Sequence, residues 1–479
     1  MAHAPPTLQD QASKSLVKNE LLTISDAECL IRELFPPLFK EANTQSKAEI
    51  IKILVEYWPY PCLHVGLLIN KPNFQNFQAI LDGVDTWLKR KYRPRMCRLQ
   101  KVDFRGEQHH ASLDMQDERE GRDHLVGTMP KKQIVESHSR TRKERLRLFS
   151  DLSFMSSLHE DKNQTRLLEW AEERTNFLHL CCEKLEIGAV EVSKVRNVLK
   201  SLQPEFIKEL ELNTVGNLSK LAKLVPFIRK MRNLQKLMLV RTFGTRTFTR
   251  EERWNISKII SLFCKLSCLQ HLTIDDVYFL TDHMTELLRC LEAPLVSLKI
   301  TLCQLSQSDL ESFAQYWNYS QLKHLCLRGV TLTNLDVKPL RDLLRHVAAN
   351  LETLDLEDCR MDDSHLSTLL PAVIECTQLT SINLYDNDIS EDVLEYFLYH
   401  TTNLSQLTTE MYPAPSEVYN ESKYVVVEIF IQICAELMDK LMDVRQPISV
   451  CFGSYSCFDC DDRYLYEDDG DVTLCLCQE

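Results

Sequence analysis

The chain has 479 residues, which is long for one hydrophobic core and predicts two or more structural subunits. Hydrophobic residues make up 44% and charged residues 26%, as in soluble globular proteins, and only 11 glycines occur, which disfavours a turn-dense all-β fold. The net charge of −13 argues against direct nucleic-acid binding, because phosphate contacts need a basic face.

Two further absences predict an intracellular protein. The first residues lack a basic segment followed by an apolar run, so no secretory signal is visible. No stretch of about 18 uncharged apolar residues occurs, so we expect no membrane span. The 18 cysteines are therefore expected as reduced thiols or metal ligands rather than as a disulfide framework.

The N-terminal part of the chain is predicted to be helical. We expect a flexible tail over residues 1–14 and a helical cap over 15–95, divided into short helices by prolines. One helix is expected from Asn73 to Lys91, because its apolar residues recur at helical spacing. Next, Leu99, Val102 and Phe104 have the spacing of a strand and predict that a repeat array begins near residue 96.

A polar, basic insert then interrupts the array over about 106–145. A solvated, disordered insertion is the favoured interpretation, and a nuclear-import signal or a nucleic-acid contact is the alternative. The array is expected to resume near Phe177, with Cys182, Leu185 and Ile187 on another strand.

The second half carries an internal repeat with the pattern L-x-x-L-x-L-x-x-N/C-x-L. Near-complete copies begin at Leu295, Leu351 and Leu379. Weaker copies begin at Ile207, Leu234, Leu269, Leu322 and Leu404. Successive starts from Leu269 to Leu404 differ by 26, 27, 29, 28 and 25 residues, which is the length of a helix-bearing leucine-rich repeat.

This repeat predicts an α/β leucine-rich-repeat solenoid, a horseshoe, over residues 96–450. The fourth and sixth positions point from a short strand into the interior, and the Asn or Cys side chain satisfies backbone groups at the turn. Helical stretches are expected at 363–375 and 391–400. Because the leucines are needed for the core, binding is expected on the variable strand and loop residues, where the concave surface takes an extended protein partner.

The acidic tail over residues 451–479 contains paired cysteines. Cys457 and Cys460 form a C-x-x-C pair, and Cys475 and Cys477 form a C-x-C pair. Four thiolates on two tight turns can enclose a tetrahedral zinc ion, which would hold together a tail too small and acidic to fold by apolar burial. Unligated thiols in a loose tail are the alternative.

The sequence contains no phosphate-binding, nucleophile-elbow or metalloprotease motif. We therefore expect that the protein is not an enzyme and that it requires no cofactor besides the zinc considered above.

Several strings resemble one known family. They are Arg32 to Phe39 (RELFPPLF), Trp58-Pro59, Ile80 to Asp85, Arg93-Pro94-Arg95, Leu180-Cys181-Cys182 and Tyr412-Pro413. With the C-terminal cysteine pairs, these strings make nearly the whole chain similar to the PRAME family, named after the preferentially expressed antigen of melanoma.

The resemblance implies a partner and a role. Members of the family act as substrate-recognition subunits of cullin-2 ubiquitin ligases, docking elongin B and elongin C through an N-terminal helix. The best register for an elongin box here is Leu21, Ser25 and Cys29, with Cys29 standing where the family pattern has an aliphatic residue. The family is also linked to transcriptional repression and to germ and early embryonic cells, and its basic nuclear-import string is reduced here to Pro130-Lys131-Lys132-Gln133.

The resulting hypothesis is a cullin-2/elongin ligase adaptor that promotes proteasomal degradation of an unidentified protein held on the repeats. The alternative is a leucine-rich-repeat scaffold or transcriptional corepressor without ligase association. We expect the protein in the cytoplasm and leave the nucleus open as a second location.

Overall fold

The computed structural model describes residues 8–18, 23–69, 72–90, 98–106, 145–155, 161–213, 218–242, 248–315, 320–457, 460, 462–473, 475 and 477. These residues belong to two compact units. Unit 1 comprises residues up to 185 together with 193–207, and unit 2 comprises 186–192 and 208–479. Nearly all of the predicted basic insert lies outside the described residues.

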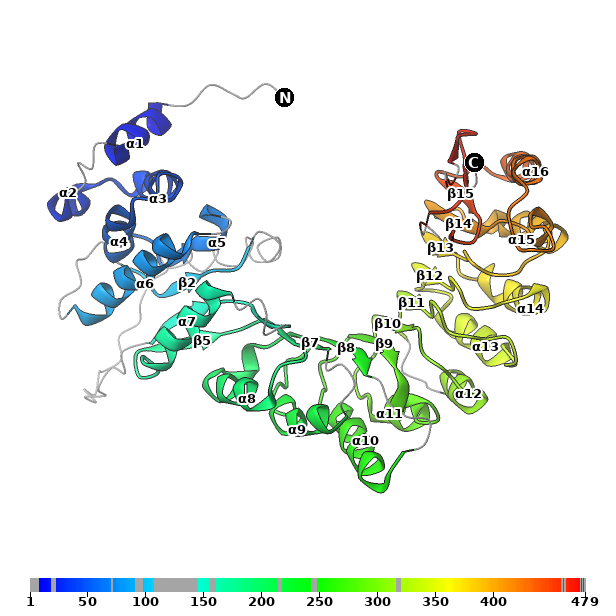
Figure 1. Ribbon diagram of the computed structural model, residues 1–479, viewed down its shortest axis with the longest axis horizontal. Helices are drawn as coiled ribbons and strands as arrows, with labels where there is room; N and C mark the ends of the chain where they lie inside the picture. Colours follow the sequence, from blue (N-terminus) through cyan, green and yellow to red (C-terminus); the bar gives the residue numbers. More distant parts are fainter. Residues whose placement is uncertain are drawn as a thin grey trace, which may run out of the picture. The chain divides into compact units, whose positions relative to one another are not determined.

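Unit 1 combines short helices with a parallel sheet (Figure 1). Its helices are α1 (Leu8–Lys18), α2 (Ile24–Cys29), α3 (Phe35–Thr44), α4 (Ala48–Glu56), α5 (Val65–Leu68), α6 (Phe74–Lys89), α7 (Lys162–Glu172) and α8 (Val192–Ser201). The parallel sheet has the order β1 (Cys62–His64), β2 (Lys101–Asp103), β3 (Leu146–Phe149) and β5 (Leu178–Cys181), and β4 (Leu152–Phe154) and β6 (Lys184–Ile187) follow β3 and β5 along the chain.

The predicted helix over 73–91 is confirmed as α6. Asn73 caps it, because its side chain accepts a 2.8 Å hydrogen bond from the backbone N–H of Asn76. The strand predicted around Val102 is confirmed as β2. Residues 8–14 differ from the predicted flexible tail, because they belong to α1, which buries Ser13 and Val17 and packs on α3.

A buried ion pair lies at the end of β2. Asp103 is fully buried and accepts hydrogen bonds of 2.9 and 2.7 Å from the guanidinium of Arg105, which also contacts Glu183. Burial acts to raise the pKa of Asp103, but the hydrogen bonds and charge of Arg105, aided by Lys101, lower this pKa to about 2. The carboxylate is therefore ionised at neutral pH, and its charge is balanced inside unit 1.

Unit 2 is a leucine-rich-repeat solenoid in which each parallel strand is followed by helical or turn structure (Figure 1). The parallel strands are β7 (Glu209–Asn213), β8 (Lys236–Thr242), β9 (His271–Val277), β10 (Ser297–Thr301), β11 (His324–Cys326), β12 (Thr353–Asp355), β13 (Ser381–Asn383), β14 (Thr409–Pro413) and β15 (Val450–Gly453), and they pair in this order. Two antiparallel strands, β16 (Leu465–Glu467) and β17 (Val472–Thr473), extend the sheet at its end.

The helices of unit 2 line the side of the array opposite the sheet. They are α9 (Leu218–Ile228), α10 (Arg250–Phe263), α11 (Met284–Cys290), α12 (Gln307–Gln315), α13 (Lys338–Val347), α14 (Asp363–Val373), α15 (Glu391–His400) and α16 (Val427–Val444). Short 3-10 turns occur at Arg32–Leu34, Pro204–Phe206, Tyr278–Leu280, Thr401–Asn403 and Ser416–Val418 of the two units. Neither unit contains, in the part that the structure describes, a helix long and apolar enough to span a membrane.

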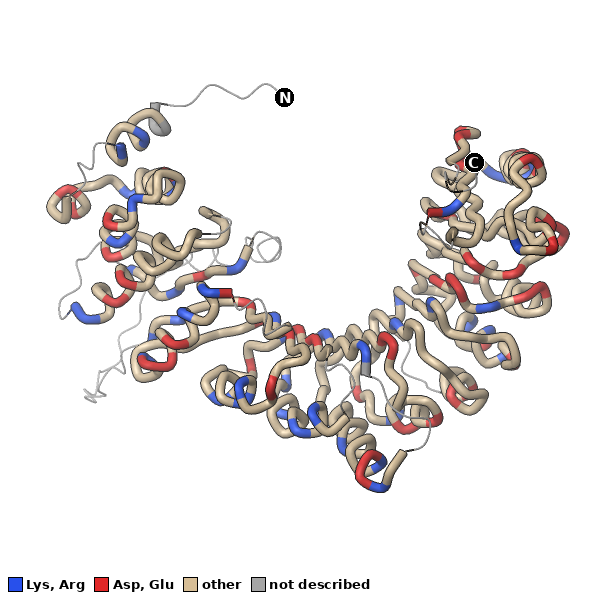
Figure 2. Tube along the Cα trace, viewed as in Figure 1, with Lys and Arg blue, Asp and Glu red and all other residues tan. Residues whose placement is uncertain are grey.

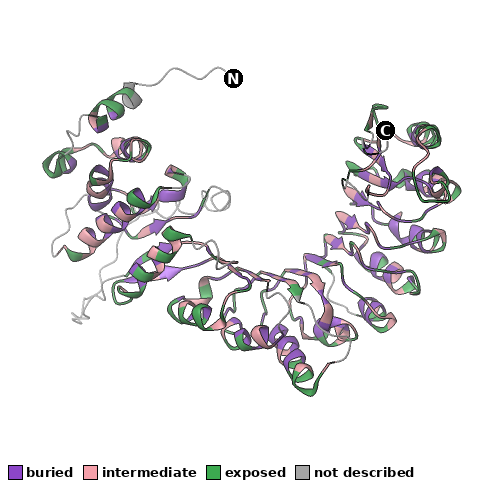
Figure 3. Cartoon of the chain, in the orientation of Figure 1, coloured by how far each residue is buried: buried purple, intermediate pink, exposed green. Residues whose placement is uncertain are grey.

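The strand register stacks one core residue of each repeat on the next. This core ladder consists of Leu210, Leu237, Leu272, Leu298, Leu325, Leu354, Ile382, Glu410 and Val450, all buried. Figure 3 shows that buried residues recur along the whole of unit 2. Each is the fourth position of a predicted repeat except at the end, where the predicted start at Leu404 is wrong by three residues. Leu407 occupies the first position instead. The backbone N–H of Thr408 donates to the carbonyl of Thr380, just as the N–H of Thr380 donates to the carbonyl of Glu352, so Leu407 corresponds to Leu379. Glu410 then occupies the fourth position, where the preceding repeats have leucine or isoleucine.

The turn residues act as the repeat pattern predicts. The Asn387 amide donates to the carbonyls of Leu356 and Leu384 at 2.9 and 2.8 Å, and its oxygen accepts the N–H of Met361 at 2.9 Å. At the same place in the preceding repeat, the Cys359 thiol donates to the carbonyl of Leu327 at 3.1 Å. These side chains satisfy backbone groups that the tight turns leave open.

One pair of cysteines departs from the expected thiol state. Cys264, after α10, and Cys290, at the end of α11, are joined by a disulfide. The expectation of thiols is wrong for this pair, because neighbouring helices bring the two Cα atoms to 4.3 Å, a separation that composition does not reveal.

The core ladder predicts a large cost for Leu354→Ala. Leu354 is 1% exposed, and truncating a buried leucine removes apolar contacts and leaves a cavity, so the free energy of unfolding of unit 2 should fall by about 2–5 kcal/mol. Thr353→Ala, on the opposite face of the same strand, should cost about 1 kcal/mol. Urea denaturation measures both, and equal losses would contradict the assigned strand faces.

The buried Asp103 pair predicts a pH-dependent effect in unit 1. Asp103→Asn removes the fully buried one of the two carboxylates that contact Arg105 and leaves Glu183, so it should cost about 1.5–3 kcal/mol of unfolding free energy at neutral pH. Because the native pKa is about 2 and the ordinary value is 3.8, the pair stabilises the fold above about pH 4 and loses this contribution as pH falls towards 2. The difference between native chain and variant should therefore shrink below about pH 4 in denaturation measured across pH, and a constant difference would contradict this account.

Candidate binding faces and metal centre

The strand face of unit 2 is the first candidate binding surface. It consists of the half-buried or exposed side chains that alternate with the core ladder: Glu209, Glu211, Lys236, Met238, His271, Thr273, Lys299, His324, Thr353, Ser381 and Thr409. Figure 2 shows that basic and acidic residues are both spread along unit 2. The face is polar and carries both signs of charge, which suits hydrogen bonding to a polypeptide better than binding to an apolar or purely anionic ligand.

The middle of this strand face carries two imidazoles. Burial, together with the nearby charges of Lys236 and His324, lowers the pKa of His271 below its ordinary value, so this ring is neutral at pH 7. The Nδ1 atom of His324 lies 3.0 Å from the Thr353 hydroxyl. The neutral His271 ring can donate or accept hydrogen bonds.

The end of the strand face is occupied by a charged network that the sequence analysis missed. Arg463, from the C-terminal tail, donates to the two carboxylate oxygens of Asp386 at 3.3 and 3.1 Å and lies 3.6 Å from Glu357. Arg328 and Asn383 each donate to Glu357 at 2.7 Å. Arg463 is the single Lys or Arg between residues 451 and 479. A lone basic residue in an acidic tail is the one feature of the sequence that could have indicated this network.

The predicted metal ligands come together in this tail. The sulfur atoms of Cys457, Cys460, Cys475 and Cys477 all lie within 4.8 Å of one another, and the Cys460 and Cys475 sulfurs are 3.4 Å apart. A backbone hydrogen bond from Asp462 acts to lower the pKa of Cys460, but hydrogen bonds among the thiols raise this pKa above its ordinary value. The two cysteine pairs that the spacing singled out therefore lie close together in the structure.

The predicted elongin-box residues lie around α2. Leu21 is outside the described residues. Ser25 and Cys29 are both exposed on α2. The apolar side chains of Ile24, on the same helix, and Ile31, which follows it, are 54% and 62% exposed. Only Ala27 of this helix is buried, so α2 is held on unit 1 by a small contact and presents most of its surface outward.

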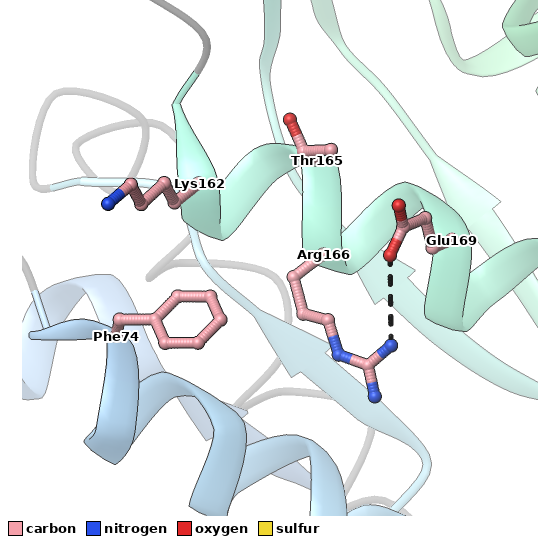
Figure 4. Close-up of a pocket in the computed structure, with 5 residues that line it drawn as sticks. All are labelled: Phe74, Lys162, Thr165, Arg166 and Glu169. Atoms are coloured by element: carbon pink, nitrogen blue, oxygen red, sulfur yellow. Dashed lines mark ion pairs between the residues drawn. The ribbon is translucent and has the colours of Figure 1, made fainter.

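A small pocket lies between α6 and α7 of unit 1 (Figure 4). It has a volume of about 250 Å³ and is lined by Phe74, Lys162, Thr165, Arg166 and Glu169. Arg166 already donates to Gln78 at 2.7 Å and lies 3.8 Å from Glu169. The pocket is therefore an open notch between two packed helices, with its guanidinium engaged inside the unit.

Family models match nearly the whole chain. The model of the PRAME N-terminal domain matches residues 5–110, and that of the PRAME C-terminal domain matches residues 146–477. The chain is 87% identical to the mouse preferentially expressed antigen in melanoma-like protein 7 over the full length of both. It is 37% identical to human PRAME family member 12, with 97% of this chain and 96% of that protein covered.

Solved structures with similar folds include leucine-rich-repeat proteins. The complex of Rad7 and Elc1 in yeast contains a chain that is 12% identical, with a TM-score of 0.40, covering 87% of this chain and 85% of that one. The leucine-rich-repeat-containing protein LegL7 from Legionella pneumophila is 10% identical, with a TM-score of 0.29, covering 62% of this chain and 98% of that one.

Proposed function

This chain belongs to the PRAME family, and on that premise we propose that it is the substrate-recognition adaptor of a ubiquitin ligase containing cullin-2, elongin B and elongin C. In this role, the N-terminal helices of unit 1 bind elongin, and the strand face of unit 2 binds the protein that is to be degraded by the proteasome. The adaptor itself performs no chemical step.

The outward surface of α2 is the observation that carries this proposal. A six-residue helix with one buried side chain contributes little to the core of unit 1, yet it presents Ile24, Ser25 and Cys29 to solvent. Exposed apolar side chains beside small residues are the composition that a partner helix can cover closely. The surface lies where the family resemblance puts the elongin box.

The strand face supports the second half of the proposal. A repeat buries its ladder residue against its neighbours and does not need the alternating side chains for its core. Those side chains can therefore be specific for a partner, and their mixture of hydroxyls, imidazoles and charges matches an extended polypeptide. The cytoplasm, with the nucleus as a second location, is where we propose that this binding occurs.

The alternative role is a repeat scaffold or transcriptional corepressor without ligase association. Cys29 favours it, because a thiol stands where the family pattern has an aliphatic anchor. The two roles share the strand face and differ in the use of α2, so elongin recovery separates them.

Charged substitutions on α2 test the docking proposal. Ser25→Arg with Cys29→Arg puts two bulky cations on exposed positions, which leaves the fold of unit 1 intact and obstructs a close helix contact. Recovery of elongin B, elongin C and cullin-2 with the tagged full-length chain should fall at least about tenfold, equivalent to about 1.4 kcal/mol of binding free energy.

The matched control for docking is Glu28→Arg, which adds positive charge to another exposed position of the same helix. It should retain most of the elongin. Unchanged recovery with the double variant would move the docking site away from α2, and absence of elongins from the native chain's partners would favour the scaffold role.

Charge reversal on the strand face tests substrate binding. Lys299→Glu changes an exposed side chain at the centre of the face, and Arg289→Glu makes the same change on α11, on the helix side of the preceding repeat. In cells treated with a proteasome inhibitor, Lys299→Glu should reduce a subset of co-purified proteins at least about tenfold while elongins remain. Identical partner sets for the two variants would contradict substrate binding at this face.

A further inference from the structure

The four tail thiols come from two segments that the last strands bring together. Cys457 and Cys460 lie in the connection between β15 and β16, and Cys475 and Cys477 follow β17. β15, β16 and β17 pair antiparallel, which returns the chain to the first cysteine pair. The backbone N–H of Cys457 donates to the carbonyl of Asp462 at 2.6 Å and closes the turn that contains Cys460.

The spacing of the sulfur atoms fits a tetrahedral ion. With Zn–S bonds of about 2.3 Å, tetrahedral geometry puts the sulfurs about 3.8 Å apart. The observed sulfurs lie within 4.8 Å of one another, with one pair at 3.4 Å, so small side-chain adjustments complete the geometry. Four sulfur donors without a histidine or carboxylate are the ligand set of structural zinc or of an iron–sulfur centre.

The tail has few other means of holding its shape. Between Cys457 and Cys477, Tyr464 and Cys475 are the described residues that are buried, and most of the others are exposed. β16 and β17 span three and two residues. Apolar burial and strand pairing of this size give marginal stability, and a metal is the usual supplement in so small a segment.

The turn that carries the thiols also positions Arg463. This residue follows Cys460 by three positions, and its guanidinium donates to the hydroxyl of Ser456 at 3.1 Å as well as to Asp386. It also lies 4.8 Å above the Tyr385 ring. Arg463 therefore connects the tail to the loop that follows β13 in the repeat array.

We propose that Cys457, Cys460, Cys475 and Cys477 bind one structural Zn²⁺ ion, and that this ion fastens Arg463 onto Asp386 and Glu357 at the end of the strand face. Binding exchanges four S–H bonds for four Zn–S bonds, releases four protons and leaves the site with a net charge of −2. All four positions are filled by protein, so the ion activates no water. The proposal is independent of the ligase role, because it concerns the conformation of unit 2.

Metal analysis of the purified full-length chain tests the ion. Elemental analysis should give about one zinc per chain and no iron, and cobalt exchanged into the site should show the intense sulfur-to-cobalt absorption of tetrahedral thiolate coordination. Cys457→Ser with Cys460→Ser should reduce zinc at least about tenfold. Cys268→Ser, at an exposed free cysteine away from the tail, is the matched control and should keep the full zinc content.

Proteolysis tests the link to Arg463. Trypsin cleavage after Arg463 should be slow in the zinc-loaded chain and at least about tenfold faster after chelation, because an unfastened tail exposes this bond. Cleavage after Lys423, an exposed residue in another loop of unit 2, should proceed at the same rate in both states. This comparison does not depend on elongin or on any substrate.

Three outcomes would overturn the proposal. Zinc-free chain with the same slow cleavage after Arg463 would leave the cysteines as thiols of a tail that folds unaided. Iron in place of zinc would assign the site to an iron–sulfur centre. Peptides that join Cys457 or Cys460 to Cys475 or Cys477 through a disulfide, found by peptide mapping under non-reducing conditions, would assign the tail sulfurs to disulfides.

Discussion

A leucine-rich repeat cannot bury its own core residue, and the structure of unit 2 depends on this constraint. Each side chain of the core ladder is covered by the ladder residues of the two neighbouring strands. The parallel pairing keeps Leu298 beside Leu325 and Leu325 beside Leu354. One shift of register would move these leucines to the opposite face of the strand. Neighbour burial therefore fixes the strand faces and the positions of the turns, while the alternating side chains remain outside the core.

The same constraint explains how the array changes at its end. Glu410 is the ladder residue of β14 and is only 1% exposed, so an unpaired charge at this position would greatly lower the stability of the fold. Arg445, in the segment between α16 and β15, binds both oxygens of this carboxylate, and the Tyr412 hydroxyl donates to it at 2.7 Å. Burial raises the pKa of Tyr412 well above its ordinary value, so the phenol remains a donor. A charged residue in the core ladder needs these specific partners. The segment between α16 and β15 supplies Arg445 to Glu410, whereas a leucine at this position would need only the apolar neighbours of a further regular repeat.

The sequence predicts those parts of the molecule in which chemistry repeats. The leucine spacing predicts the ladder, α14 and α15, and the cysteine spacing predicts the four thiols that lie together. The pattern predicts the last repeat at Leu404, because it requires an apolar residue at the fourth position. Glu410 departs from that pattern, and it can do so because Arg445, 35 residues away, neutralises its charge. The Cys264–Cys290 bond has the same origin, since it joins residues 26 positions apart that no periodicity marks. The Asp103 pair differs, because Arg105 is a close neighbour in the sequence and only the burial of the pair depends on the fold.

Arg463 shows why the remaining part of the site could not be predicted and what it changes. Burial raises the pKa of Asp386 and the charge of Arg463 opposes that rise, so the tail helps to keep this carboxylate ionised. Asp386 and Glu357 already have their cationic partner within the chain, and a basic ligand would have to displace Arg463 to reach them. In the role that we propose, partner selection by the strand face therefore falls to strands further from the tail, such as those of Lys299 and His324. Arg463 thus occupies the acidic end of the strand face, and in the zinc site that we propose, the thiol cluster would hold this cation in place.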